Sequence, residues 1–477
     1  MPRIFDAILV LSFAFALAIP DNEPTLNRKV CDVCRCTVNI VDCSNRNLTS
    51  NLDDHEWPST PLELITFENN QIAKIKPFTS NVVVKAIKLC HNKIDMIEHH
   101  AFKWTYNLTE LDLSHNLLTA ENLMPYAFEG RFQLDAYAPL KKLQVLNLSN
   151  NLLHSINRDL FEHTKDLRTL ILSNNPLEGI DVPVMYSFAE LPYLEELHLS
   201  NCSLKKVDEA ILHSFRFLKK LNISYNNFFV LPDALSQTKP LEVLIMDGNP
   251  IELLNEANEF PLMPNLKELQ MNNMTRLLAI DKGSLSNLEN LEILSIENCP
   301  LLEEIDDEAL AKKQEQGTTT WPPLKKLYLS NNALRYLPAS LVARWDKLEE
   351  LRITNNQWSC DCDNQYLIST LLVEQGKRLM GTNVIASLTC SAPPEHRNRT
   401  LMSLSNRKLR CLDYYGARPE RDAAVLVGML LGVLLAVPVV LVIFIFWKRG
   451  FFFCGRQGPA SFSRAFYKRA EPCDYDI

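Results

Sequence analysis

Two groups of closely spaced cysteines are the residues of this 477-residue chain whose type and spacing point most directly to chemistry. The first group consists of Cys31, Cys34, Cys36 and Cys43, and the second of Cys360, Cys362, Cys390 and Cys411. Crowded thiols of this kind hold zinc in an intracellular protein, whereas in a secreted protein they form disulfide bonds. Because four cysteines can pair in several ways, spacing alone leaves the connectivity open.

The two apolar ends of the chain indicate which compartment the cysteines occupy. Residues 1–18 contain a basic residue, an apolar run and a terminal A-x-A triplet, which together are typical of a secretory signal peptide. Residues 423–447 contain no charged side chain, and a helix of that length crosses a hydrocarbon core of about 30 Å. Lys448 and Arg449 follow directly, so we expect the tail 448–477 in the cytoplasm. The sequence predicts a single-pass type I plasma-membrane protein with an extracellular amino terminus and disulfide-bonded cysteines.

Other groups that could do chemistry are isolated. The sequence lacks the H-E-x-x-H, G-x-S-x-G and Walker patterns, and its histidines are scattered. His99 and His100 beside Glu98 have metal-binding side chains, but adjacent residues point in different directions, so we expect a solvated turn there. A net charge of -8 without an aromatic-basic stripe argues against a nucleic-acid partner. We therefore predict that the protein is not an enzyme and holds neither a metal nor a cofactor.

A repeated leucine pattern provides the framework that must position these residues. The segment from Leu143 to Leu153 fits L-x-x-L-x-L-x-x-N-x-L, in which a short strand buries alternate leucines and an asparagine follows at the turn. Units begin at Leu62, Val84, Leu108, Leu143, Leu167, Leu194, Leu218, Leu241, Leu266, Leu291, Leu324 and Leu348. A unit this short cannot bury its own leucines, so neighbouring units must stack and share one interior. We predict an α/β solenoid over residues 61–356, with about 12 units and a parallel sheet on the concave side.

These units resemble the extracellular leucine-rich-repeat receptors and adhesion proteins of animals, which have Toll-ectodomain or Slit-like repeats and cysteine-rich caps. The resemblance implies a leucine-rich-repeat horseshoe with caps at 28–60 and 357–412, in which Trp358 packs on the last coil. It also implies four disulfide pairs, Cys31–Cys36, Cys34–Cys43, Cys360–Cys390 and Cys362–Cys411. Gln357 departs from the proline that the family usually has before this tryptophan, which weakens the turn but leaves the cap assignment in place.

Three further cysteines lie within the repeats. Cys202 and Cys299 stand at the asparagine position of their units, where we expect buried thiols that act as small hydrogen-bond donors. Cys90 follows Leu89 on the strand side and has no obvious mate. It is either a half-buried free thiol or one half of an intermolecular disulfide.

Seven predicted glycosylation sites lie between the signal and the membrane segment, at Asn47, Asn107, Asn147, Asn201, Asn222, Asn273 and Asn398. Asn147 and Asn222 lie at strand centres, where sugars would occupy the middle of the concave face. We therefore expect a ligand contact either on the later units or on an edge or convex loop. The candidate ligand face on the later units consists of Glu242, Lys267, Glu268, Gln270, Glu292, Lys325, Lys326 and Tyr328.

Three segments break the regular period. Residues 119–139 form an insertion that we expect to bulge from the convex side, as a binding loop or as tolerated decoration. The polar run 312–320 is expected to be a mobile loop. In one later unit Met274 replaces the asparagine and Arg276 replaces the next apolar residue, which predicts a local irregularity there.

The remaining predictions concern the carboxy-terminal part of the chain, which consists of a linker at 413–422, the membrane helix and the tail. Gly428 and Gly432 form a G-x-x-x-G pattern that lets two helices approach closely, which favours a homodimer. The tail is too short for a folded Toll-type signalling domain. Cys454 near the membrane is a lipidation candidate, and the terminal Tyr475–Ile477 resembles a ligand of a PDZ-type adaptor.

The sequence as a whole predicts a cell-surface recognition protein, a receptor or an adhesion molecule, that binds an extracellular protein ligand or a receptor on a neighbouring cell. Two other functions stay open. One is an innate-immune pattern-recognition subunit that lacks its own signalling domain, which direct binding of microbial material would favour. The other is an auxiliary subunit of a channel or receptor, which co-purification dependent on residues 423–447 would favour.

Overall fold

The computed structural model describes residues 28–79, 82–133, 136–207, 209–314, 318–342, 344, 346–411 and 419–448. The chain divides into two compact units, Met1–Leu409 and Arg410–Ile477, and each is described by itself. The predicted signal peptide and the tail beyond Lys448, with Cys454 and Tyr475–Ile477, lie outside the described residues.

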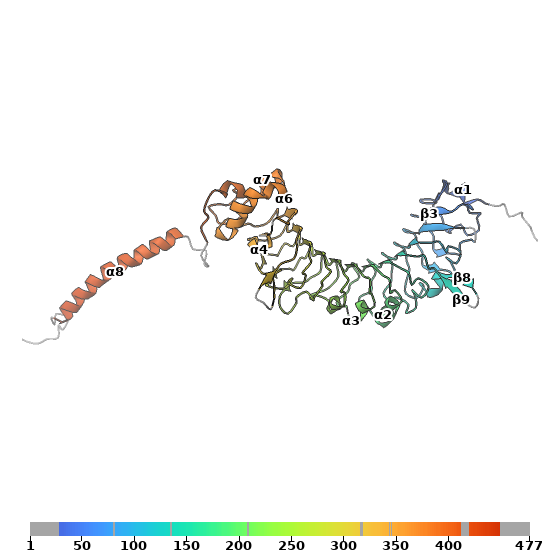
Figure 1. The fold of residues 1–477 in the computed structure, drawn as a ribbon, viewed down its shortest axis with the longest axis horizontal. Helices are drawn as coiled ribbons and strands as arrows, with labels where there is room; N and C mark the ends of the chain where they lie inside the picture. The colour runs from blue at the N-terminus through green and yellow to red at the C-terminus, as the bar shows by residue number, and fades with distance from the viewer. Residues whose placement is uncertain are drawn as a thin grey trace, which may run out of the picture. The chain divides into compact units, whose positions relative to one another are not determined.

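Short strands from successive units form one 14-stranded sheet along the inner curve of the first unit (Figure 1). The strands, in order across the sheet, are β1 (Arg35–Cys36), β2 (Ile40–Asp42), β3 (Leu62–Thr66), β5 (Val84–Lys88), β7 (Glu110–Asp112), β10 (Val145–Asn147), β11 (Thr169–Ile171), β12 (Glu196–His198), β13 (Lys220–Asn222), β14 (Val243–Ile245), β16 (Glu268–Gln270), β18 (Ile293–Ser295), β22 (Lys326–Tyr328) and β23 (Glu350–Arg352). β1 and β2 are antiparallel, and β2 onward is parallel. Leu146 lies opposite Leu111 and Leu170, so the units stack in register and the predicted solenoid is confirmed.

The connections on the outer side of the solenoid are short and varied. Helices α2 (Val182–Ala189) and α3 (Glu209–His213) lie on the outer side of the curve in Figure 1, away from the sheet. Smaller parallel sheets join β4 (Lys74–Ile75) to β6 (Met96–Ile97), and β15 (Leu253–Leu254) to β17 (Ala279–Ile280) and β19 (Glu304–Ile305). The remaining outer elements are η1 (Pro125–Phe128), η2 (Asp233–Gln237) and α4 (Ala339–Val342).

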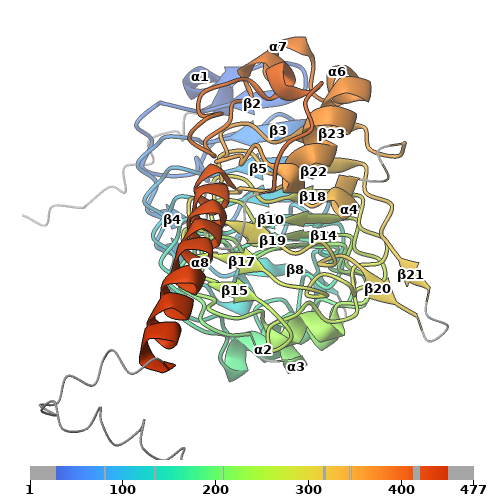
Figure 2. The same cartoon turned by 90° about the vertical axis from the view of Figure 1, so that its left-hand side faces the viewer.

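Both long insertions contain antiparallel hairpins. The insertion 119–139 holds η1 and the pair β8 (Glu129–Gln133) and β9 (Ala136–Pro139). In the run 312–320, β20 (Lys312–Lys313) pairs with β21 (Thr319–Thr320), and this hairpin projects from one side in Figure 2. The two ends of this run therefore pair as short strands, while its expected mobility stays a prediction.

A ladder of buried asparagines joins successive turns, and we call it the asparagine ladder. Asn151 Nδ2 donates to the carbonyls of Leu113 and Leu148, both at 3.0 Å, and its Oδ1 accepts from the amide of Leu118 at 3.1 Å. The same position is held by Asn70, Asn92, Asn116, Asn175, Asn226, Asn249, Asn332 and Asn356. These contacts supply partners for backbone groups that burial would otherwise leave unsatisfied.

Cys202 and Cys299 take the place of asparagine in the ladder. Cys202 Sγ lies 3.4 Å from the carbonyl oxygen of Leu172, and Cys299 Sγ lies 3.5 Å from that of Met271. Both thiols are fully buried, and burial raises the pKa of Cys202 to about 11 and that of Cys299 to about 12. They are therefore weak donors inside the core, as the sequence predicts.

Cysteine-rich segments cover both ends of the solenoid. The amino-terminal segment begins with α1 (Val30–Val33) and holds Cys31–Cys36 and Cys34–Cys43, with Cα atoms 5.5 and 4.5 Å apart. The carboxy-terminal segment holds Cys360–Cys390, with Cα atoms 5.7 Å apart, and Cys362 and Cys411 are also disulfide-bonded. Its helical turns are η3 (Cys362–Asn364), η4 (Leu367–Leu371), α5 (Leu372–Glu374), α6 (Gly376–Leu379), α7 (Thr382–Ser387) and η5 (Leu401–Leu404). Trp358 is buried in this segment and donates from Nε1 to the Ile353 carbonyl at 3.2 Å.

The second unit contains one long helix, α8 (Pro419–Lys448). Its segment Ala423–Lys448 contains an 18-residue stretch with a mean hydropathy of 3.1, and a helix of this segment's length exceeds a hydrocarbon core of about 30 Å. Length and composition therefore make it a candidate membrane span. Gly428, Gly432 and Pro438 all lie within this helix.

Candidate functional site

Three rows of side chains run across the concave sheet, because residues that alternate with the buried leucines point to its open face. The first row consists of Thr109, Gln144, Arg168, Glu195, Lys219, Glu242, Lys267, Glu292, Lys325 and Glu349. The second row consists of Glu110, Val145, Thr169, Glu196, Lys220, Val243, Glu268, Ile293, Lys326 and Glu350, and the third of Asp112, Asn147, Ile171, His198, Asn222, Ile245, Gln270, Ser295, Tyr328 and Arg352. The in-register strands bring the eight candidate ligand residues together in these rows.

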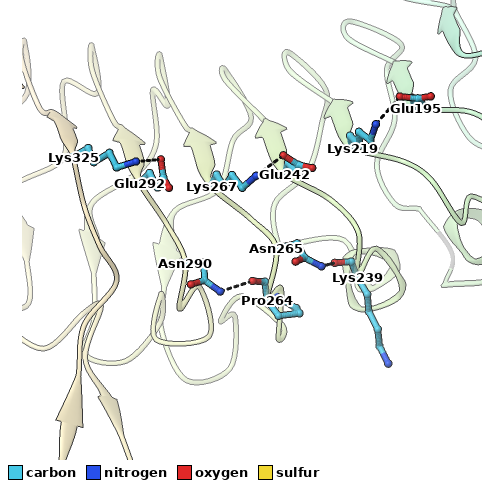
Figure 3. Close-up of polar contacts among 10 residues, drawn as sticks. All are labelled: Glu195, Lys219, Lys239, Glu242, Pro264, Asn265, Lys267, Asn290, Glu292 and Lys325. Atoms are coloured by element: carbon cyan, nitrogen blue, oxygen red, sulfur yellow. Dashed lines mark hydrogen bonds and ion pairs between the residues drawn. The ribbon is translucent and has the colours of Figure 1, made fainter.

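The first row alternates in charge over eight consecutive units, which run in order through Arg168, Glu195, Lys219, Glu242, Lys267, Glu292, Lys325 and Glu349. Side chains on adjacent strands form ion pairs along it, as Figure 3 shows. Glu195 contacts Arg168 at 2.9 Å and Lys219 at 2.8 Å. Glu242 contacts Lys267 at 2.7 Å, and Glu292 contacts Lys325 at 2.6 Å. We call this series the ion-pair ladder.

The ion-pair ladder organises the surface more than it stabilises the fold. Its side chains are half-exposed to exposed, and ion pairs in water contribute little to stability. The hydrogen bond from Lys219 lowers the pKa of Glu195 and raises the pKa of Lys219. The bond from Lys267 to Glu242 likewise raises the pKa of Lys267. Glu195, Lys219 and Lys267 therefore stay charged at neutral pH, and the row presents regularly spaced acidic and basic side chains.

The second and third rows carry apolar side chains between the charges. Glu268 and Gln270 on β16 hydrogen-bond to each other at 2.5 Å. The neighbouring strands place Val243 and Ile245 on one side and Ile293 on the other, and all three are half-buried. This mixture of apolar area and hydrogen-bonding groups is suited to contact with the surface of a protein partner.

Tyr328, Glu350 and Arg352 form a contact cluster at the carboxy-terminal end of the concave sheet. Tyr328 donates its hydroxyl to Glu350 at 2.8 Å, and the Arg352 guanidinium lies 4.1 Å from the Tyr328 ring centre. Arg352 also contacts Glu350 at 2.7 Å. Burial, together with the bond to Glu350, raises the pKa of Tyr328 to about 12. Sequence reasoning included Tyr328 but missed Glu350 and Arg352, although the L-x-x-L spacing of the last unit places them in the second and third rows.

Two predicted glycosylation sites have a structural role in the third row. Asn147 Oδ1 accepts from the amide of Ser149 at 3.0 Å, and Asn222 Oδ1 accepts from Ser224 at 3.0 Å. Asp112 holds the equivalent turn, where its Oδ1 accepts from the Ser114 amide at 2.9 Å. These bonds use the amide oxygen, whereas glycosylation modifies the nitrogen, so both roles are compatible at Asn147 and Asn222.

The other singled-out residues have separate surroundings. His99 stacks on Tyr126 with ring centres 3.6 Å apart, while His100 contacts Glu129 at 2.7 Å. Within the described ranges, no group of three or more His, Cys, Asp or Glu residues is arranged to hold a metal ion. Cys90 is a buried free thiol, and burial raises its pKa to about 12, so it is poorly reactive.

The irregular unit keeps its buried face but changes its exposed one. Met274 is fully buried at the asparagine position, and the exposed Arg276 contacts Glu252 at 3.4 Å. The guanidinium of Arg276 also lies 5.7 Å from the centre of the Phe229 ring. Met274 fills the buried position but has no amide to donate, so the predicted irregularity interrupts the asparagine ladder as well as changing the exposed side of this turn.

Comparison with known proteins agrees with this architecture. A leucine rich repeat family model matches residues 83–135, 131–177 and 192–251. The chain is 28% identical over 301 residues to podocan of Mus musculus, which is 62% of this chain and 44% of podocan. It is 28% identical over 322 residues to the trophoblast glycoprotein of Macaca fascicularis, 64% of this chain and 63% of that protein. The matches thus span less than two thirds of either relative.

A solved structure shows the same fold. A chain of the octameric complex of Latrophilin 3, Unc5D and FLRT2 has a TM-score of 0.51 and 21% identity, and the match covers 77% of this chain and 96% of that one. The chain thus contains leucine-rich repeats, shares the fold of this solved chain, has disulfides near both ends, and is similar to podocan and to the trophoblast glycoprotein.

Proposed function

We propose that this protein is a cell-surface recognition protein, a receptor or an adhesion molecule, that binds an extracellular protein partner through its solenoid. The observation that carries this proposal is the ion-pair ladder, an exposed and regularly spaced array of charges across adjacent strands. Such a rigid curved surface offers a protein partner many contacts whose geometry is set before binding. The extracellular relatives and the apolar helix α8 support the placement at a cell surface.

The contact is proposed to centre on the candidate ligand face from Glu242 to Tyr328. Its charged residues hold one another in place through pairs such as Lys267–Glu242, so these side chains lose less conformational entropy when a partner binds. Tyr328 and Arg352 at the end of this face are the residue types that most often dominate protein interfaces. Val243 and Ile293 add apolar area between the charged rows.

The remaining predictions complete the proposed topology. The caps 28–60 and 357–412 flank the repeats 61–356, and α8 crosses the plasma membrane once with the amino terminus outside. Gly428 and Gly432 provide a close-approach seam for a homodimer. Recognition rather than catalysis is proposed as the activity of the extracellular part.

Proximity labelling on intact cells that express the full-length protein tests this proposal. We expect labelled neighbours that carry extracellular domains, and we expect the same neighbours after residues 448–477 are deleted. Neighbours that disappear with the tail would instead indicate cytoplasmic partners. If neither experiment labels a neighbour with an extracellular domain, the proposal is contradicted.

A further inference from the structure

One residue with a positive φ follows each strand of the concave sheet and forms the rim between the sheet and the adjacent loops. We call these residues, which follow the strands from β2 to β23, the rim row, and they are Asn45, Asn69, His91, His115, Asn150, Asn174, Asn201, Tyr225, Gly248, Asn273, Asn298, Asn331 and Asn355. Asparagine predominates because it tolerates this left-handed conformation better than most residues do. Neighbouring amides bond along the rim row, for example Asn174 with Asn201 at 2.7 Å and Asn298 with Asn331 at 2.9 Å.

Tyr225 interrupts the rim row and reaches across a whole unit. A Cβ atom placed at Gly248 would lie 2.4 Å from Cδ1 of Tyr225, so the ring passes over the position where any other residue would have a side chain. The Tyr225 hydroxyl lies 3.1 Å from Nδ2 of Asn273, two units further along the chain. Tyr225 stays 53% exposed, so much of the residue is accessible to solvent.

Asn273 is both the partner of this hydroxyl and the first residue of a glycosylation sequon. Met274, the second residue, is buried, and Thr275, the third, is exposed. The atom that glycosylation modifies, Asn273 Nδ2, is thus the atom that contacts Tyr225. A pyranose ring has an apolar face of C–H groups, which packs well on an exposed aromatic ring.

We propose that Asn273 carries an N-linked glycan whose first N-acetylglucosamine packs against the exposed ring of Tyr225, so that this glycan is a structural part of the rim. The glycan joins when Asn273 Nδ2 loses a proton and bonds to the anomeric carbon of a lipid-pyrophosphate-linked oligosaccharide. The bond between that carbon and the pyrophosphate breaks, and the lipid pyrophosphate leaves. This inference rests on the extracellular placement proposed above.

Asn201 provides a matched control within the rim row. It also begins a sequon, and its Nδ2 donates to Asn174 Oδ1 at 2.7 Å. The Tyr225 ring extends over Gly248 toward Asn273 and therefore away from Asn201. A glycan on Asn201 is accordingly expected to make no aromatic contact and to contribute nothing to the rim.

The experiment compares full-length protein from a secretory animal cell line with the variants Thr275→Ala and Ser203→Ala. Each substitution removes one sequon at an exposed residue and keeps the asparagine, so the Asn273–Tyr225 hydrogen bond remains available. Glycopeptide mass spectrometry measures occupancy, nitration of Tyr225 by tetranitromethane measures ring accessibility, and thermal unfolding measures stability. We expect Thr275→Ala to speed the nitration several-fold and to lower Tm by about 1–2 °C, with no change in Ser203→Ala.

A second variant separates the sugar contact from other effects of Thr275. Tyr225→Asn restores the residue type found elsewhere in the rim row and removes the ring. In this background we expect Thr275→Ala to cause no further loss of Tm. Equal losses in both backgrounds, an unoccupied Asn273 beside other occupied sequons, or unchanged nitration would each overturn the inference. A protein without glycan at any sequon would instead contradict the extracellular placement.

Discussion

The asparagine ladder and the ion-pair ladder repeat with the same period and lie in opposite environments. Asn175 is 1% exposed and bonds to Leu148 and Leu172 carbonyls at 2.9 and 2.8 Å, whereas Lys267 and Glu242 meet in solvent at 2.7 Å. A buried polar group without its partner costs far more than an exposed ion pair contributes. The comparison teaches that the first ladder determines whether the units stack, while the second is free to determine what the surface binds.

The largest effect is expected from Asn175→Ala. The substitution removes one of two side-chain donors from each of the buried Leu148 and Leu172 carbonyls and leaves the Leu153 amide without its acceptor, so we expect a loss of about 2 kcal/mol in the free energy of unfolding. Denaturant unfolding followed by circular dichroism measures it. Asn265→Ala is the control, because the exposed Asn265 makes one bond, to the Lys239 carbonyl at 2.9 Å (Figure 3). A similar loss in both variants would show that burial does not distinguish the two asparagines.

A smaller loss is expected from Asn175→Cys. The chain already uses Cys202 and Cys299 at this position, each with Sγ within 3.5 Å of the carbonyl that asparagine would serve. A thiol keeps one weak donor but offers no good acceptor for the Leu153 amide. The same unfolding measurement should place Asn175→Cys between wild type and Asn175→Ala. A loss equal to that of alanine would mean that the thiols only fill space.

Lys267→Glu should affect stability less than either buried change. It places three carboxylates in succession along the ion-pair ladder, at 242, 267 and 292, and removes the 2.7 Å pair with Glu242. Because these groups are exposed, we expect Tm to fall by about 1 °C at low salt and to recover as the salt concentration rises. Thermal unfolding measured from 20 to 500 mM NaCl checks this salt dependence, because that range shortens the Debye length from about 20 Å to about 4 Å. A large loss that salt does not change would indicate a buried rather than an exposed ladder.

The smallest effect concerns pH. The pKa of Glu195 is lowered by the hydrogen bond from Lys219, so its folded form binds a proton less readily than the unfolded chain does. The resulting stabilisation is present above the ordinary pKa of 4.5 and is lost as pH falls through the lower folded value. The stability difference between wild type and Glu195→Gln should therefore shrink between pH 7 and pH 3. A difference that grows on acidification would contradict the assigned sign.

The stacking of the units was predictable because it depends on local spacing. The leucines and asparagines of L-x-x-L-x-L-x-x-N-x-L recur within each unit, so the strands, their register and the shared interior follow from the period alone. The same positions also gave the candidate ligand residues, since side chains that alternate with buried leucines must face outward.

Contacts between units were harder to predict because they depend on the reach of side chains across strands. The alternation of charge from Arg168 to Glu349 is visible only when the same position is compared across all units. It cannot be seen in the sequence of a single unit. The reach of Tyr225 to Asn273 depends on the missing side chain at Gly248, which no single unit reveals. The hairpin at 312–320 was missed because a polar run of this length has no apolar alternation to mark its strands.

The most direct test of the account compares two sets of four alanine substitutions in the full-length protein on cells. One set changes Lys267, Glu268, Lys325 and Tyr328 on the concave sheet, and the matched set changes Lys282, Glu308, Lys312 and Tyr186 outside the three rows. The measurement is binding of the partner found by proximity labelling, with surface level and Tm measured in parallel. We predict that the concave set abolishes binding while Tm stays close to that of the matched set. Undiminished binding by a folded concave variant would contradict the claim that the candidate ligand face is the recognition surface.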